Sequence, residues 1–269
     1  MAAWGSDGVG FGLIVPQGWR LDLAHIAGPV EQFEHAVRTA QAAERLGFDS
    51  IWLYDHLQTR DGDPDRVLEC WTSLAALARE TSRVRLGQIV TCAAYRNPGL
   101  LAQMASTVDA ASGGRVTVGL GAGWDEREWR DFGYGDDLPP VRDRLAHLER
   151  TLQVLRERRG DAPILVGGGG EKVLLRLVAQ YASACNFTDS LDPEFYRHKL
   201  GVLREHCDRL GRDYDAIEKT ASFTVTEDVD FEALAAAGIE TFIVYLTPPS
   251  DLGILERFAE VVVTRDDAG

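Results

Sequence analysis

The sequence lacks the features that would place it in a disulfide-rich, zinc-binding or membrane class. Its four cysteines lie far apart, without CxxC or zinc-type spacing, so we expect reduced thiols. No apolar run approaches the roughly 20 residues of a membrane-spanning helix, and no apolar signal segment opens the chain. These absences predict a cytoplasmic protein without a membrane partner.

Positive charge is also scarce. The chain has 28 Lys and Arg against 42 Asp and Glu, a formal net charge of -14. Because phosphate backbones are bound chiefly by Lys and Arg, this balance argues against a nucleic-acid or anionic-membrane partner. Any anionic ligand must therefore be held by local geometry.

What the sequence does contain is a regular alternation of short apolar runs with amphipathic stretches. A chain of 269 residues is close to the roughly 250 of a typical (β/α)₈ barrel, and strict β-then-α order implies parallel strands. We predict an α/β fold, a TIM barrel forming a single domain over residues 1–269. A doubly wound open sheet is the structural alternative.

The predicted elements come in eight pairs. The strands are 9–15, 50–54, 84–90, 115–119, 163–166, 184–187, 219–225 and 241–246. The helices are 30–46, 69–80, 99–111, 141–159, 171–181, 193–210, 230–237 and 251–262. The tail 264–269 is expected to be a frayed terminus.

A run of four glycines follows the fifth predicted strand and opens a helix. Gly167, Gly168, Gly169 and Gly170 would expose backbone N–H groups where the helix dipole also favours an anion. Glycines also permit a tight turn, but one or two suffice for that. We predict a phosphate cradle here.

Active sites of (β/α)₈ barrels lie at the carboxyl ends of the strands, which directs attention to polar residues there. Asp55 and His56 end the second strand, where the imidazole could exchange a proton near neutral pH. Thr91 is a polar residue at the end of the third strand. The segment after it leads to Asn97-Pro98, which is typical of a helix start.

The segment 119–124, Gly-Leu-Gly-Ala-Gly-Trp, imitates a dinucleotide fingerprint but has Trp124 in place of the third glycine. It is either a close-packed turn or a flat surface for a planar ring. No nucleophile elbow, HExxH motif or metal-spaced carboxylate cluster occurs, so we predict no metal site and assign the chemistry to an organic cofactor.

Taken together, four segments resemble the luciferase-like monooxygenase superfamily and, more narrowly, its coenzyme F420-dependent branch. These segments are 47–56, 91–98, 112–124 and 163–172. The resemblance implies a TIM barrel that binds a deazaflavin or flavin at its carboxyl face. The phosphate would lie at the glycine turn and the ring over the third strand, where a non-proline cis peptide is expected among residues 88–90.

The resemblance also implies roles for individual residues. His56 would donate or accept a proton beside the hydride-carrying carbon. The cofactor would be contacted by Asp55, Thr91, Ala122, Gly123 and Arg127. Relatives commonly form dimers, so a homodimer acting on a small-molecule substrate is expected.

Two departures from the family pattern stand out. Trp124 occupies the position where sugar-phosphate dehydrogenases of this family carry a catalytic glutamate, which argues against that activity. The connection between the fourth helix, 141–159, and the fifth strand, 163–166, is shortened where relatives carry an insertion that helps to cover the site. A more open pocket is expected.

Three functions follow as hypotheses. The first is an F420-dependent oxidoreductase that transfers hydride between the deazaflavin and an unknown small organic substrate. The second is an FMN-dependent monooxygenase, which the same barrel would serve. The third is a family member without the lid that binds a cofactor or partner without catalysis.

Overall fold

The computed structural model describes residues 8–61, 66–225, 229–247 and 252–260. Its strands are β1 (Gly10–Ile14), β2 (Ser50–Leu53), β3 (Arg85–Gln88), β4 (Thr91–Cys92), β5 (Val116–Gly121), β6 (Ile164–Gly167), β7 (Ala184–Thr188), β8 (Glu218–Thr224) and β9 (Thr241–Tyr245). Its α-helices are α1 (Pro29–Arg45), α2 (Cys70–Glu80), α3 (Pro98–Ser112), α4 (Glu126–Asp131), α5 (Val141–Arg159), α6 (Leu174–Tyr181), α7 (Pro193–Leu210), α8 (Phe231–Ala236) and α9 (Leu252–Phe258). The predicted tail 264–269 lies outside the described residues.

The strands form a closed parallel barrel. Their order is β3-β2-β1-β9-β8-β7-β6-β5-β4, and a pairing between β3 and β5 closes the ring. β3 and β4 are two parts of one barrel strand, separated by a cis peptide bond between Ile89 and Val90. Eight strand positions result, which confirms the predicted barrel, and the open-sheet alternative is wrong.

Alternation along the strands separates two apolar clusters. Ile51 and Leu53 of β2 belong to the larger cluster between the sheet and the helices, whereas Trp52 belongs to a smaller cluster with Ile14, Leu165 and Ile243. Because successive side chains on a strand point to opposite faces, the smaller cluster fills the inside of the barrel. The barrel is therefore packed and is not a pore.

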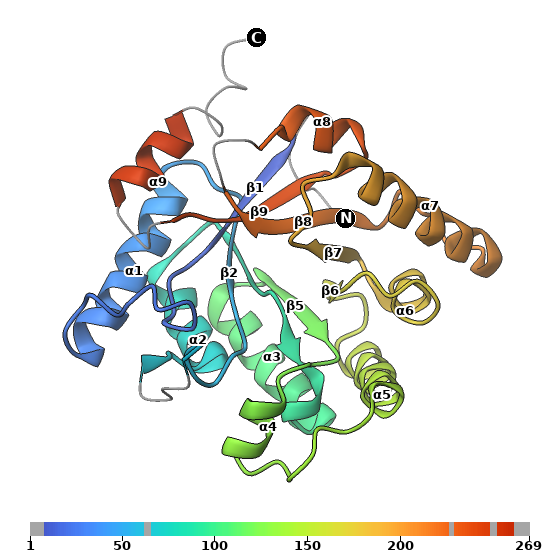
Figure 1. Ribbon diagram of the computed structural model, residues 1–269, viewed down its shortest axis with the longest axis horizontal. Coiled ribbons are helices and arrows are strands. Elements are labelled where there is room, and N and C mark those ends of the chain that lie inside the picture. Colours follow the sequence, from blue (N-terminus) through green and yellow to red (C-terminus); the bar gives the residue numbers. More distant parts are fainter. Residues whose placement is uncertain (1–7, 62–65, 226–228, 248–251, 261–269) are drawn as a thin grey trace.

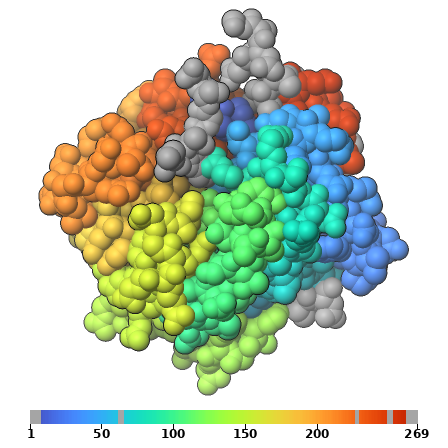
Figure 2. All heavy atoms as spheres, turned by 180° about the vertical axis from the view of Figure 1, so that it is seen from behind, coloured from blue at the N-terminus to red at the C-terminus, as the bar shows by residue number. Residues whose placement is uncertain are grey.

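Helices surround this barrel in sequence order. Figure 1 shows them around the strands, and in the view from behind α3, α5 and α7 form much of the surface (Figure 2). α3 begins as Asn97-Pro98 predicted, because the Asn97 side chain accepts hydrogen bonds from the amides of Gly99 and Leu100. No helix of the described residues is long and apolar enough to cross a membrane.

Two predicted elements differ from the structure, and one observed helix was not predicted. The third strand, predicted as 84–90 without a break, is divided at residues 89 and 90. The helix after the glycines begins at Leu174 and not at residue 171, since residues 171–173 form a turn. α4 was not predicted, because six residues rich in charge carry too little apolar periodicity to show a helix.

Candidate active site

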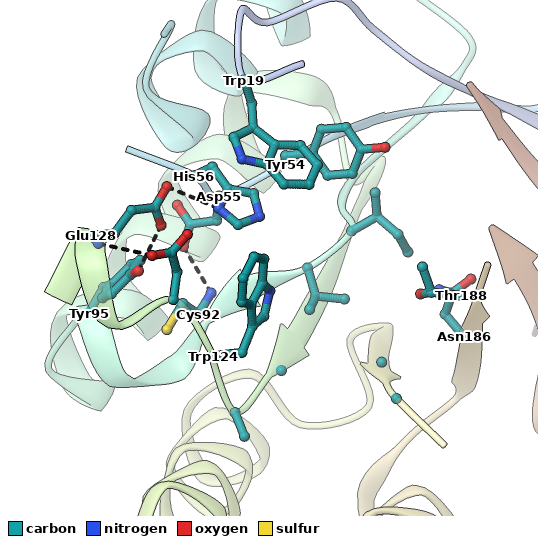
Figure 3. A pocket seen from close by; sticks show the side chains of 18 of the residues that line it. Trp19, Tyr54, Asp55, His56, Cys92, Tyr95, Trp124, Glu128, Asn186 and Thr188 are labelled. Carbon is teal, nitrogen blue, oxygen red and sulfur yellow. Dashed lines mark hydrogen bonds and ion pairs between the residues drawn. The ribbon is translucent and has the colours of Figure 1, made fainter. Parts of the chain in front are cut away.

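A pocket of about 850 Å³ lies at the carboxyl ends of the strands, where the barrel fold predicts an active site. Its wall includes Tyr54 and His56 after β2, the link between β3 and β4, and the glycine-rich end of β5. Asn186 and Thr188 of β7 lie across the pocket from His56 (Figure 3). The volume is in the range of small-molecule and cofactor sites.

His56 lies in this pocket as predicted and pairs with a buried carboxylate. Its Nδ1 atom is 3.0 Å from Oε1 of Glu128, whose side chain is 1% exposed. Among the described residues, no hydrogen bond involves the other ring nitrogen, Nε2. The pair therefore fixes the orientation of the imidazole and leaves one nitrogen for a ligand.

Glu128 is held by several donors besides His56. Oε1 also accepts the amide of Leu57 at 2.9 Å, and Oε2 accepts the hydroxyl of Tyr95 at 2.8 Å (Figure 3). Burial alone would raise the pKa of the Glu128 carboxyl, yet the donors around it hold this pKa below its ordinary value of 4.5. Glu128 is therefore a carboxylate at neutral pH.

Sequence reasoning missed Glu128. It is supplied by α4, whose N-cap Asp125 accepts hydrogen bonds from the amides of Arg127 and Glu128. The signal that could have found this helix start is an aspartate three residues before a glutamate, a few residues after a strand.

Aromatic rings form the wall around His56. The Trp19 indole stacks on the imidazole with centroids 3.8 Å apart and planes 5° apart. The Trp124 indole lies edge-on to the His56 ring, with the two ring centroids 5.5 Å apart, and Trp124 is 65% exposed. His56 is therefore confined between two indoles at the pocket mouth (Figure 3).

Asp55 also reaches the pocket lining, but its carboxylate is already engaged. Its oxygens accept hydrogen bonds from Arg96 at 2.5 and 2.8 Å and from the amide of Cys92 at 2.9 Å. Burial would lower the pKa of the Arg96 guanidinium, but Asp55 raises it above its ordinary value. Asp55 thus joins the ends of β2 and β4 and has little freedom to bind a cofactor.

The remaining predicted contacts divide into two groups. Ala122, Gly123 and Arg127 line the pocket, and the Arg127 guanidinium donates to the backbone carbonyls of residues 59 and 60. Thr91 is not among the residues that line the pocket, and its hydroxyl accepts a hydrogen bond from Trp71 of α2 at 3.1 Å, so its predicted contact with the cofactor stays a prediction. Strand alternation explains why Thr91 does not line the pocket, because the neighbouring Cys92 faces the pocket instead.

The four glycines at and just after the end of β6 have different surroundings. Gly167 and Gly168 line the pocket, and Gly168 has a φ of +118° and donates its amide to the Asn186 carbonyl. Gly169 and Gly170 lie outside the lining, and their amides donate no hydrogen bond within the described part of the chain. Two free backbone donors beside the pocket are what a phosphate cradle requires.

Part of the glycine content has a packing reason. A Cβ atom on Gly167 would lie 2.8 Å from Cγ1 of Val90, and one on Gly121 would lie 2.5 Å from Cγ2 of the same side chain. These two glycines make room for Val90, which itself lines the pocket.

His56, Asp125 and Glu128 place ligand atoms within 4.8 Å of one another, a grouping that the sequence spacing did not predict. Both Glu128 oxygens and Oδ1 of Asp125 already accept hydrogen bonds from protein donors. We assign these residues to orienting His56 and stabilising α4.

Comparison with known proteins gives the following similarities. A family model described as luciferase-like monooxygenase matches residues 11–159. The F420-dependent glucose-6-phosphate dehydrogenase of Intrasporangium calvum is 30% identical over 243 residues, covering 79% of this chain and 70% of that protein. The 5,10-methylenetetrahydromethanopterin reductase of Archaeoglobus fulgidus is 27% identical over 244 residues, covering 80% and 67%. The solved structure of an F420-dependent secondary alcohol dehydrogenase with an F420-acetone adduct superposes with a TM-score of 0.76 at 18% identity, covering 95% of this chain and 98% of that chain.

Proposed function

The chain belongs to the luciferase-like monooxygenase family, and from this premise we propose that it is an F420-dependent oxidoreductase acting on a small organic substrate. Named relatives at 26–30% identity are F420-dependent glucose-6-phosphate dehydrogenases. The observation that carries the proposal is His56, held by Glu128 in a barrel-end pocket with Nε2 unengaged by the described residues.

The residues of the pocket fit a deazaflavin. The walls supplied by Ile89, Val90 and Ala122 are apolar and suit a planar ring. The unengaged amides of Gly169 and Gly170 would hold the phosphate. When bound, the deazaflavin supplies a ring carbon that donates or accepts a hydride.

The protein's own contribution is proton handling and orientation. His56 would give or take at Nε2 the proton that accompanies the hydride, while Glu128 stabilises the protonated imidazole through Nδ1. The indoles of Trp19 and Trp124 would reduce the access of water to the imidazole.

Sugar-phosphate dehydrogenation is not included in this proposal. Trp124 stands where the family's sugar-phosphate dehydrogenases carry a glutamate, and its indole is 65% exposed at the pocket mouth. Glu128 brings a different glutamate to the same imidazole, in a buried position where it orients His56.

We also propose that the connection between α5 and β6 is a shortened lid region. Only residues 160–163 separate these two elements, and the chain covers 70% of the length of the Intrasporangium relative. A pocket without this cover is open to solvent or to a partner subunit, and a homodimer is the assembly that we propose.

The proposal is tested by titrating the purified protein with F420 and following the cofactor's fluorescence. We expect saturable binding in the micromolar range. The absence of binding in that range would refute the proposal. Tight FMN binding together with oxygen consumption by reduced FMN would favour a monooxygenase, and F420 binding without turnover on a broad substrate panel would indicate a non-catalytic protein.

A further inference from the structure

Arg20 is a pocket residue that forms no ion pair within the described residues, although the buried Asp22 carboxyl interacts with its charge from a distance. Its guanidinium carbon lies 5.3 Å from the ring centroids of Trp19 and Tyr54, and 4.7 Å from that of Tyr245. Nη1 donates to the Thr224 hydroxyl at 2.8 Å, and Nε is buried without a hydrogen-bond partner. Within the described residues, no carboxylate forms an ion pair with Arg20.

Arg20 brings positive charge to the pocket of an acidic chain. The protein has a formal net charge of -14, so carboxylates are plentiful. The exposed Arg60 lies 4.7 Å from the Trp19 ring and likewise has no ion-pair partner among the described residues. One wall of the pocket is therefore cationic in an acidic protein.

The carboxylates of the pocket do not neutralise this wall. Asp55 is paired with Arg96, Glu128 is paired with His56, and Asp125 caps α4. Asp189 also lines the pocket, but it is exposed to solvent and forms no ion pair with Arg20. The buried Asp22 carboxyl interacts with Arg20, but it accepts hydrogen bonds from the amides of Gln17 and Gly18 and forms no ion pair with the guanidinium. A ligand oxyanion would supply the paired negative charge that a partly buried guanidinium favours.

The cationic wall lies next to the proposed proton-transfer group. The Trp19 indole lies against the Arg20 guanidinium and stacks in parallel on the His56 ring, with ring centroids 3.8 Å apart. The ring centroids of Trp19 and Tyr54 are 4.6 Å apart (Figure 3). The glycines of the phosphate cradle follow β6 and are provided by a different part of the barrel. A group bound at Arg20 would thus lie near His56 and apart from the cradle.

We propose that Arg20 binds an oxyanion of the substrate, so that the substrate is a small organic acid held against Trp19 and Tyr54 beside His56. This inference rests on the proposed function, because only an oxidoreductase would have the bound acid as its substrate. A planar guanidinium binds carboxylates and phosphates in a bidentate manner, which would orient the acid as well as attract it. Aromatic walls favour an apolar body attached to the charged group.

The test is calorimetric titration with benzoate and with benzamide, its neutral counterpart, using cofactor-free protein and F420-saturated protein. We expect benzoate to bind at least about tenfold more tightly than benzamide, the loss typical of one charge-assisted hydrogen-bonded pair. Arg20→Met should abolish this preference and leave F420 affinity within about twofold. Arg20→Lys, which keeps the charge but not the planar fork, should give an intermediate benzoate affinity.

The control is Arg142→Met, since Arg142 is 92% exposed on α5 and is not a pocket residue. It should bind benzoate as the unaltered protein does. Equal benzoate affinity in the Arg20 variants and the unaltered protein, or no preference for benzoate in the unaltered protein, would overturn the proposal. A loss of F420 affinity with benzoate binding intact would assign the oxyanion to the cofactor and would also overturn it.

The two proposals fail in different ways. If F420 does not bind while cofactor-free protein still prefers benzoate through Arg20, the oxidoreductase is refuted and the anion site remains. If F420 binds and the benzoate preference is missing, the anion site is refuted and the oxidoreductase proposal remains.

Discussion

At the scale of single residues, the proposed chemistry depends on a carboxylate that lies outside the sequence motif containing His56. Glu128 lies 72 positions further along the chain, and its Oε1 atom meets Nδ1 of His56 at 3.0 Å. A negative charge there stabilises the imidazole when it carries two protons. His56 therefore acts as one half of a pair.

The pair gives a prediction about turnover. His56→Ala should lower kcat by roughly 10²–10⁴-fold, as is typical for a general acid or base, while F420 affinity changes little. Glu128→Gln should lower kcat by at least about tenfold with little change in KM, because only proton transfer is impaired. Steady-state kinetics on a substrate found by screening organic acids measures both.

Glu126→Gln is the matched control, since this glutamate is exposed on the same helix two residues earlier. It should behave as the unaltered protein. An unchanged rate in His56→Ala would remove His56 from the mechanism.

A second buried carboxyl, Glu218 at the start of β8, gives a prediction about stability. Burial raises its pKa from 4.5 to about 7, although Thr241 donates a hydrogen bond that acts in the opposite direction. The folded protein thus binds this proton more tightly than the unfolded chain, so the stability linked to it is present below pH 4.5 and lost as the pH rises through 7.

Glu218→Gln removes the buried charge and keeps an oxygen for Thr241. At pH 8 the variant should melt a few degrees higher than the unaltered protein, and the difference should shrink at pH 5. Thermal unfolding at the two pH values measures this. Glu34→Gln, at an exposed position on α1, should show no such pH dependence; a constant difference at both pH values for Glu218→Gln would contradict the argument.

At the scale of elements, α4 is the part of the molecule that determines whether the site is assembled. It has six residues, too few to be stable alone, and its first turn is held by the Asp125 side chain. Because α4 supplies Glu128, a substitution of its N-cap residue should also disturb the pairing of Glu128 with His56.

We therefore predict two effects of Asp125→Ala. The loss of the cap should cost about 0.5–2 kcal/mol in the free energy of unfolding, and kcat should fall because Glu128 is displaced. Asp192→Ala is the matched control: Asp192 caps α7 through the amide of Glu194, away from the pocket. It should destabilise the protein by a similar amount without lowering kcat. Equal kcat values in the two variants would contradict a special role for α4.

The elements also show how far the sequence could be interpreted. Long amphipathic helices were predicted well, and the observed bounds of α5 and α7 coincide with the predicted 141–159 and 193–210. α4 was missed because its position depends on contacts between distant residues, such as Glu128 with Tyr95. His56 was found because strand order alone places it at the carboxyl end of the barrel, whereas the side on which Thr91 faces depends on the break in its strand.

At the scale of the whole molecule, the barrel is an acidic protein whose pocket contains two arginines, Arg20 and Arg60, that form no ion pair with a described residue. The predicted cis peptide lies between Ile89 and Val90, as the resemblance implied. The different surroundings of the glycines required the structure, because Gly167 makes room for Val90, while the amides of Gly169 and Gly170 donate to no acceptor in the described ranges. Sequence alone could not separate these two uses of the same residue type.

The proposed homodimer belongs to this scale. In light scattering, the protein should show twice its chain mass of 29.6 kDa. Covering of the open pocket by a partner is one reason to expect this assembly. A monomeric mass over a range of micromolar concentrations would contradict it.

The most direct test of the central claim is a crystal structure of the protein with F420 bound. Our account predicts the deazaflavin ring against Ile89 and Val90, Nε2 of His56 facing the ring, and the phosphate at the amides of Gly169 and Gly170. A cofactor whose ring lies outside this pocket, or a phosphate bound away from the glycine turn, would contradict it.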